Sequence, residues 1–227
     1  MPGVTSTFNG QGIRAARVVY HSTSGDTSAQ TVVSGTVLTP LGQAPKGGWP
    51  VISWTHATTG IADICAPSRD SASNPAHADI DYVYPELNAW LAKGWAVVRT
   101  DYQGLGTPGT HPYLIGPAAA HDAIDVIRAA RHLVPQVGRN WVAAGHSQGG
   151  HAALFTAALG PKYGRELRLK GVAAFAPASH IAEEAGAVGG LTSPGGGLSG
   201  IASLVAVGAA TQISGLDAKT LFTPAAA

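Results

Sequence analysis

Residues 141–159 read WVAAGHSQGGHAALFTAAL, and within them a short apolar strand pattern gives way to a helical one. At the change, residues 145–149 read GHSQG, which places a serine between two glycines. A strand that leads directly into a helix across G-x-S-x-G holds the serine in a strained turn, where glycines avoid the clashes that a Cβ would cause. We therefore predict that Ser147 is a nucleophile presented above the edge of a sheet. The alternative is an ordinary Ser-Gly turn at the end of a strand.

The sequence around this turn predicts an α/β protein. Apolar runs rich in β-branched residues indicate six strands, at residues 13–20, 31–38, 50–55, 95–100, 141–145 and 172–176. Amphipathic or helix-like patterns cover residues 86–93, 118–134 and 149–158. Strands that alternate with helices predict a mostly parallel sheet with crossover helices. The first two strands could form a hairpin through a turn at Gly25 and Asp26.

Length and charge narrow the class of protein. A chain of 227 residues can bury about 70–75% of its unfolded surface, so we expect a single core. With 14 basic and 13 acidic residues and no basic run, the chain is not expected to bind nucleic acid. No apolar run reaches the roughly 18–20 residues that a membrane span needs. We expect no cofactor and no metal.

The N-terminus and the cysteine content bear on the compartment. Residues 1–10 lack the basic and apolar regions of a signal peptide. Met1 is the only methionine, which would also fit a start codon placed on a mature secreted chain. Cys65 is the only cysteine, so it is either a free thiol or half of a pair whose partner lies elsewhere.

Backbone N–H groups near the serine are candidates for an oxyanion hole. The N–H of Gln148 stands at the start of a helix, where the helix dipole favours a developing negative charge. A second donor is expected from residues 55–60, THATTG, with Thr58 favoured and Thr59 close behind. The alternative is a plain turn that the threonine hydroxyls stabilise.

A third loop, DYQGLGTPGTHPYL at residues 101–114, follows a strand and lies at the edge where open α/β folds bind ligands. Tyr102, His111 and Tyr113 could line a substrate pocket there. Alternatively, Asp101 and His111 anchor the loop through hydrogen bonds. Beyond the last strand, residues 181–227 are rich in Gly, Ala and Ser and show no strand pattern, which indicates a mobile or helical excursion from the sheet.

Three segments in this order, THATTGIADICAPS, TDYQGLGTPGTHPYL and GHSQGG, resemble the secretory lipase family of the α/β-hydrolase superfamily, including its lipase A-like members. The resemblance runs from about residue 13 to 185. It implies an α/β-hydrolase core at residues 1–180 and a cap inserted after the sixth strand, which begins at 181–227. It also implies an extracellular serine carboxylic-ester hydrolase that acts on small-molecule or lipid esters. Ser147 would then lie in a nucleophile elbow formed with Gly145, His146 and Gly149.

The chain departs from the family pattern at two places. Bacterial relatives usually carry H-G-T-T-G where this chain has HATTG at residues 56–60, and the added methyl could alter the oxyanion turn. In this superfamily the catalytic acid and then the histidine follow the serine in the sequence. Here only His151 and His180 follow Ser147, and the acids that follow it are Glu166, Glu183, Glu184 and Asp217.

Neither histidine fits the expected position well. His151 lies four residues into the helix after the serine, so its side chain points along the helix flank. His180 lies just beyond the sixth strand, where it could act as the base, line the substrate pocket or belong to the hinge of the cap. We therefore expect that the acid and the histidine come from a companion C-terminal polypeptide, so that this chain is the N-terminal part of the domain. The alternatives are a non-catalytic binding module that kept the elbow, and a serine peptidase or acyltransferase on the same fold.

Overall fold

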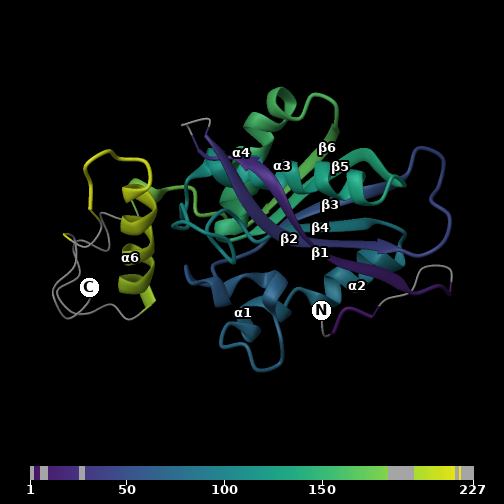
Figure 1. Cartoon of the computed structure of the whole chain (residues 1–227), viewed down its shortest axis with the longest axis horizontal. Coiled ribbons are helices and arrows are strands. Elements are labelled where there is room, and N and C mark those ends of the chain that lie inside the picture. Colours follow the sequence, from purple (N-terminus) through teal and green to yellow (C-terminus); the bar gives the residue numbers. More distant parts are fainter. Residues whose placement is uncertain (1–2, 6–9, 26–28, 184–196, 218–219, 221–227) are drawn as a thin grey trace.

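The computed structural model describes residues 3–5, 10–25, 29–183, 197–217 and 220 (Figure 1). They form an α/β-hydrolase fold around a six-stranded sheet in the order β1-β2-β4-β3-β5-β6. Strand β2 runs opposite to the other five, so it pairs antiparallel with β1 and β4, and the remaining pairs are parallel. This confirms the mostly parallel sheet. The strands are β1 (Ile13–Thr23), β2 (Gln30–Pro40), β3 (Trp49–Thr55), β4 (Ala96–Thr100), β5 (Val137–His146) and β6 (Arg168–Phe175).

Helices cover both faces of the sheet and leave its central strands buried (Figure 1). On one face lie α3 (Gly116–Leu133) and α4 (Gln148–Tyr163), and on the other lie α1 (His77–Asp81) and α2 (Tyr84–Ala92). Every residue of β4 is buried, as expected of a parallel strand with both faces covered. This packing explains why β3 and β4 read as continuous apolar runs rather than as alternating ones.

The predicted helices and strands are all present, with different ends. The pattern for α4 stopped at residue 158, whereas the helix continues through Pro161 to Tyr163. The hairpin of β1 and β2 is confirmed, and the N–H of Ser24 donates to the carbonyl of Ala29 at 2.8 Å. The predicted turn residue Asp26 lies outside the described residues. No sequence pattern indicated α1 or the two short 3-10 helices Asp63–Cys65 and Pro67–Arg69.

The edge strand β6 differs from the other parallel strands because no residue in it is fully buried. Its neighbour on one side is β5, and no described residue pairs with its other edge. Phe175, at its carboxyl end, is 54% exposed. Parallel strands are normally covered on both faces, so β6 leaves backbone groups and apolar side chains open to water.

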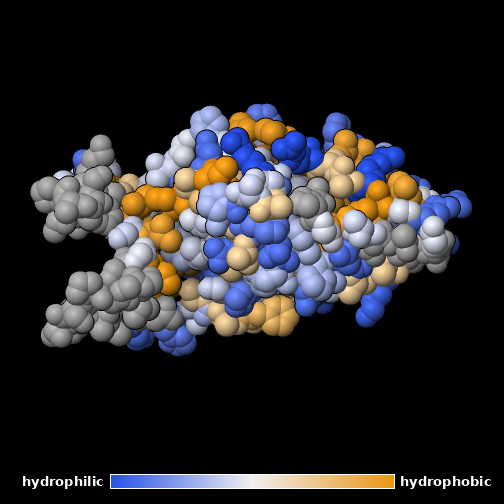
Figure 2. Space-filling model, turned by 90° about the horizontal axis from the view of Figure 1, so that it is seen from below, coloured by the Kyte–Doolittle hydropathy of each residue, from blue (hydrophilic) through white to orange (hydrophobic). Residues whose placement is uncertain are grey.

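Helix α6 (Gly197–Ala210) stands beside the main body, at the end where the loop after β4 lies (Figure 1). It carries no charged residue, and Figure 2 shows hydrophobic side chains gathered at this end of the molecule. It approaches the body closely at Gly208, where a Cβ would collide with the carbonyl oxygen of Tyr113. Residues 184–196, 218–219 and 221–227 of the predicted cap lie outside the described residues, so the division into core and cap stays a prediction. No described helix is long and apolar enough to cross a membrane.

Candidate active site

Ser147 links the last residue of β5 to the first residue of α4 in a backbone conformation that L-residues rarely adopt. Its φ is +55° and its ψ is −115°. Three hydrogen bonds hold this conformation: its N–H donates to the carbonyl of Phe175 at 2.9 Å, and its carbonyl accepts from the N–H of His151 at 3.0 Å and from that of Ala178 at 3.4 Å. This is the strained strand-to-helix turn that G-x-S-x-G predicted.

The glycines of the elbow are required by the close approach of β3. A Cβ on Gly145 would collide with the hydroxyl of Thr55, and a Cβ on Gly149 would collide with the carbonyl oxygen of Thr55. The Thr55 hydroxyl also donates to the carbonyl of Gly149 at 2.8 Å. The end of β3 is therefore held against the elbow, and the HATTG turn begins directly beside it.

Three backbone N–H groups near the elbow are unused. No described residue accepts a hydrogen bond from the N–H of Gln148, Thr58 or Thr59. Thr59 is buried and its hydroxyl has no partner among the described residues, whereas the Thr58 hydroxyl bonds the Tyr113 hydroxyl at 2.7 Å. These are the N–H groups that the sequence indicated as oxyanion donors, and each is free to donate a hydrogen bond.

The loop after β4 is tied down by hydrogen bonds within the protein. Tyr102, His111 and Tyr113 are all buried, at 1%, 2% and 4% exposure. Nδ1 of His111 contacts the carbonyl of Gln103 at 2.9 Å, and burial lowers the His111 pKa to about 4. The carboxylate of Asp101 accepts from the Ser34 hydroxyl at 2.6 Å and from the N–H of Ser68 at 2.8 Å. The loop is thus anchored by Asp101 and His111, and a pocket lined by its side chains stays a prediction.

No role was predicted for His56, which the structure places at the start of the HATTG turn. The ring is 2% exposed and lies between the carbonyls of Ala57, at 2.6 Å from Nδ1, and Asp101, at 3.3 Å from Nε2. Burial lowers the His56 pKa to about 3, so the ring is neutral at physiological pH. The Tyr102 hydroxyl donates to the His56 carbonyl at 2.9 Å, which joins the oxyanion turn to the loop after β4. Only the position of the histidine at the start of HATTG could have indicated this role.

No described histidine or carboxylate contacts the Ser147 hydroxyl. Nδ1 of His151 donates to the carbonyl of Ala178 at 2.9 Å, so this ring is used to hold the chain after β6. His180 is exposed, and its Nδ1 contacts the hydroxyl of Ser179 at 3.0 Å. Glu166 pairs with Arg128 at 2.7 Å.

The other acidic residues that follow Ser147 in the sequence make no described contact with its hydroxyl. Glu183 is exposed, Glu184 lies outside the described residues, and Asp217 follows α6. In the part of the chain that the structure describes, no histidine or carboxylate downstream of Ser147 is thus placed beside its hydroxyl.

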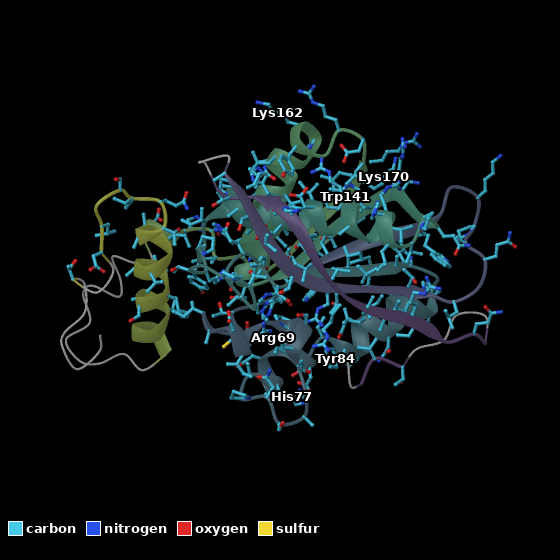
Figure 3. The ribbon with its side chains drawn as sticks, in the orientation of Figure 1. Arg69, His77, Tyr84, Trp141, Lys162 and Lys170 are labelled. Atoms are coloured by element: carbon cyan, nitrogen blue, oxygen red, sulfur yellow. The ribbon has the colours of Figure 1, made fainter. Side chains whose placement is uncertain are left out.

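A histidine–carboxylate pair does exist elsewhere, on the α1 side of the sheet. Nδ1 of His77 lies 2.9 Å from Asp70, and the Tyr84 hydroxyl donates to the same carboxylate at 2.5 Å. The Asp70 hydrogen bond is the main cause that raises the His77 pKa. Figure 3 shows His77 and Tyr84 below the sheet, near α1 and α2. This cluster fastens the segment between β3 and β4 rather than serving Ser147.

Neither of the two large cavities that the described residues form includes Ser147. One, of about 520 Å³, is lined by Arg131, Arg139 and Arg168 near the amino ends of β5 and β6. The other, of about 540 Å³, lies between β1 and α3. Within the described ranges, no group of three or more His, Cys, Asp or Glu side chains could hold a metal ion. The candidate site is thus defined by the elbow and its two neighbouring loops.

Comparisons with solved structures relate this fold to lipases and esterases. Candida antarctica lipase A superposes with a TM-score of 0.71 at 16% identity, over 96% of this chain and 49% of that chain. A Legionella pneumophila protein has a TM-score of 0.67 at 22% identity, over 88% and 52%. The rice cell wall degrading esterase LipA from Xanthomonas oryzae is 30% identical over 70% of this chain and 41% of its own, with a TM-score of 0.54.

The chain therefore spans about half the length, or less, of the solved structures that it matches. No curated protein sequence matches it. The profile of the secretory lipase family matches residues 75–220, which is well over half of the chain and includes the elbow and the loop after β4. The chain belongs to the secretory lipase family.

Proposed function

We propose that this chain carries the nucleophile of a serine carboxylic-ester hydrolase. The observation that carries the proposal is the elbow at Ser147, where a strained serine with an unpaired hydroxyl stands beside unused backbone N–H groups. A hydroxyl so placed is open to a substrate at the top of the sheet. A surface Ser-Gly turn would have no reason to keep this strained backbone.

The reaction follows from these groups and one base. The base removes the proton of the Ser147 hydroxyl as its oxygen attacks the ester carbonyl carbon. The resulting oxyanion accepts hydrogen bonds from the N–H of Gln148 and from that of Thr58 or Thr59. The protonated base then gives its proton to the leaving alcohol, and the acyl group stays on Ser147. Water, deprotonated by the same base, hydrolyses this acyl-enzyme and releases the acid.

We further propose that the acid and the histidine lie on polypeptide outside these 227 residues. The exposed edge of β6 supports this, because a further strand there would cover its open backbone. The relatives are about twice as long as this chain, and none of the histidines described here reaches Ser147. Residues 181–227 would then begin the cap, with Tyr102, His111, Tyr113 and His180 facing the substrate pocket or supporting it. Cys65, which is free in this structure, could pair with a cysteine of that polypeptide.

The similar proteins, helix α6 and the family name support a substrate class and a location. The similar proteins are named as a lipase and a cell wall degrading esterase, and both names refer to ester hydrolysis. The uncharged helix α6 near the loop after β4 favours an apolar acyl group over a peptide. The family name supports an extracellular location.

Hydrolysis of p-nitrophenyl butyrate by the complete natural protein tests the proposal. Ser147→Ala should lower kcat by about 10⁶-fold, the size of loss seen when a serine hydrolase loses its nucleophile. Ser73→Ala, at an exposed serine far along the chain, is the matched control and should keep full activity. Activity in Ser147→Ala would overturn the assignment. No hydrolysis by the natural protein would favour a binding module, and cleavage of peptide anilides in preference to esters would favour a peptidase.

A further inference from the structure

We propose that His111 and Tyr113 are positioning residues that together set both halves of the oxyanion hole. Each side chain contacts the side chain of one of the two proposed donor residues. His111 and Tyr113 lie in the loop after β4, with Pro112 between them. The inference rests on the proposed function, since it gives these residues a task only if Gln148 and Thr58 donate to an oxyanion.

The first contact joins His111 to Gln148. Nε2 of His111 lies 2.9 Å from Nε2 of the Gln148 amide. On the opposite side of the ring, Nδ1 faces the carbonyl oxygen of Gln103 at 2.9 Å, which can only accept a hydrogen bond. Nδ1 therefore carries the proton, and Nε2 offers a lone pair to the NH₂ group of Gln148. The Gln148 amide is therefore the donor and the His111 ring is the acceptor.

This contact is shielded from water. His111 is 2% exposed and Gln148 is 3% exposed, so water does not compete for either group. Burial also keeps His111 neutral, because its pKa is lowered to about 4, and the lone pair on Nε2 is therefore present at neutral pH. The peptide unit that joins Ser147 to Gln148 is already held at its carbonyl by the N–H of His151, and the contact with His111 adds a restraint from the Gln148 side chain. The direction of its backbone N–H is thereby restricted.

The second contact joins Tyr113 to Thr58, on the other side of the proposed oxyanion hole. The two hydroxyls are 2.7 Å apart, and the Tyr113 side chain is buried while Thr58 is half-buried. Thr58 lies in a turn without regular hydrogen bonding, so its hydroxyl contact is the main restraint that the described residues place on it. Removing the Tyr113 hydroxyl would free this turn.

The two contacts are mechanically linked through a short rigid segment. The N–H of Tyr113 donates to the carbonyl of His111 at 2.9 Å, and the N–H of Ile115 donates to the carbonyl of Pro112 at 3.0 Å. Pro112 has a fixed φ, and the His111 ring stacks against Tyr102 with centroids 5.7 Å apart. A shift of this segment would therefore move both donors together. Positioning of this kind acts on the transition state, so it should affect kcat rather than KM.

The test for His111 uses two replacements that keep different halves of the ring. His111→Asn places an amide NH₂ where Nδ1 donates to Gln103, but leaves nothing opposite Gln148. His111→Gln reaches the position of Nε2 with an oxygen that can accept from Gln148. We expect His111→Asn to lower kcat for p-nitrophenyl butyrate about 10-fold with KM unchanged, less than the ~10²–10³-fold that loss of a donor itself causes. His111→Gln should restore most of that loss.

The test for Tyr113 is a double-mutant cycle with its partner. Tyr113→Phe and Thr58→Val each remove one hydroxyl at nearly constant shape, and each should lower kcat about 5–10-fold, an intermediate positioning effect. The double variant should be no worse than the single ones, because both remove the same contact. Equal kcat in wild type and Tyr113→Phe, or strict additivity in the cycle, would overturn this half of the proposal.

Two measurements separate this inference from the proposed function. If Ser147→Ala keeps its activity, the proposed function fails, whatever the His111 variants do. If Ser147→Ala is inactive while His111→Asn and Tyr113→Phe keep wild-type kcat, only the positioning role fails. Independently of activity, the backbone amide resonance of Gln148 should shift in His111→Asn and return in His111→Gln. An unchanged resonance would overturn the link between His111 and Gln148.

Discussion

The backbone N–H of Ser147 donates to the carbonyl of Phe175 across 2.9 Å, so the elbow is tied directly to the exposed edge strand β6. Phe175 is 54% exposed, and no described residue pairs with the outer edge of its strand. The conformation of Ser147 therefore depends on a strand that the described residues leave half-covered. A partner for β6 would stabilise the elbow as well as the sheet.

The mass of the natural protein tests whether such a partner exists. Under denaturing conditions, ester-hydrolysing material should contain either a polypeptide heavier than 22.9 kDa or a second polypeptide beside this one. The additional sequence should carry the acid and the histidine that serve Ser147. A single 22.9 kDa polypeptide that hydrolyses esters at a normal enzymatic rate would contradict this, and His180 would then become the leading base.

The close contact between Gly149 and β3 predicts a large effect of a single methyl group. Gly149→Ala would drive a Cβ into the carbonyl oxygen of Thr55, so either β3 or the elbow must move. We expect the free energy of unfolding to fall by about 1–3 kcal/mol, as in other overpacked sites, together with a loss of activity. Urea unfolding measures the first effect and ester hydrolysis the second.

Gly171 offers a matched control in the edge strand β6. No atom of the described residues lies within 4 Å of a Cβ built at Gly171, so Gly171→Ala in this chain should change stability by no more than about 0.5 kcal/mol. Equal stability of the two alanine variants would show that Gly149 is not held as closely as the structure has it.

The buried carboxyl group of Asp122 should make the protein less stable as pH rises. This group is fully buried in α3, and burial raises its pKa to about 7. One oxygen accepts from the N–H of Gln103 at 2.8 Å, and this bond and the nearby Ser22 hydroxyl offset only part of the rise in pKa. The folded protein therefore holds a proton that the unfolded chain releases above about pH 4. The stability contributed by this proton is present below pH 4 and is lost as pH rises to about 7.

Asp122→Asn should remove this loss because its amide is neutral at every pH and can still accept from Gln103. We expect the variant to be more stable than wild type at pH 8, by up to about 4 kcal/mol, because only wild type must then lose a proton from the buried carboxyl group. At pH 4 the two proteins should have similar stability. Urea midpoints measured from pH 4 to pH 8 check this, and a constant difference across the range would show that Asp122 is charged in the folded protein.

The feature of the candidate site that the sequence predicted most directly, the strand-to-helix turn at Ser147, is encoded within a few residues. The elbow at Ser147 follows from a strand, a helix and two glycines within one pentapeptide, and the neighbours of Ser147 in the structure agree. The bond between Gln148 and His111 joins residues 37 positions apart. Neither periodicity nor spacing reports such a contact, so the sequence left two places open for His111, one in a pocket and one as an anchor of its own loop.

The start of strand β6 and the short helix α1 were not predicted, for a related reason. Strand β6 starts at Arg168, four residues before its apolar run, because an exposed edge strand tolerates charged side chains that a buried strand does not. Helix α1 spans only five residues, too few to show a helical period. Packing against the sheet, rather than a local pattern, fixes it.

Trapping the acyl group tests the central claim most directly. The natural protein is treated with a p-nitrophenyl phosphonate, digested, and analysed by mass spectrometry. We predict one stoichiometric adduct on the peptide that contains Ser147, release of one equivalent of p-nitrophenol, and neither in Ser147→Ala. An adduct on another residue, or undiminished ester hydrolysis in Ser147→Ala, would contradict the account.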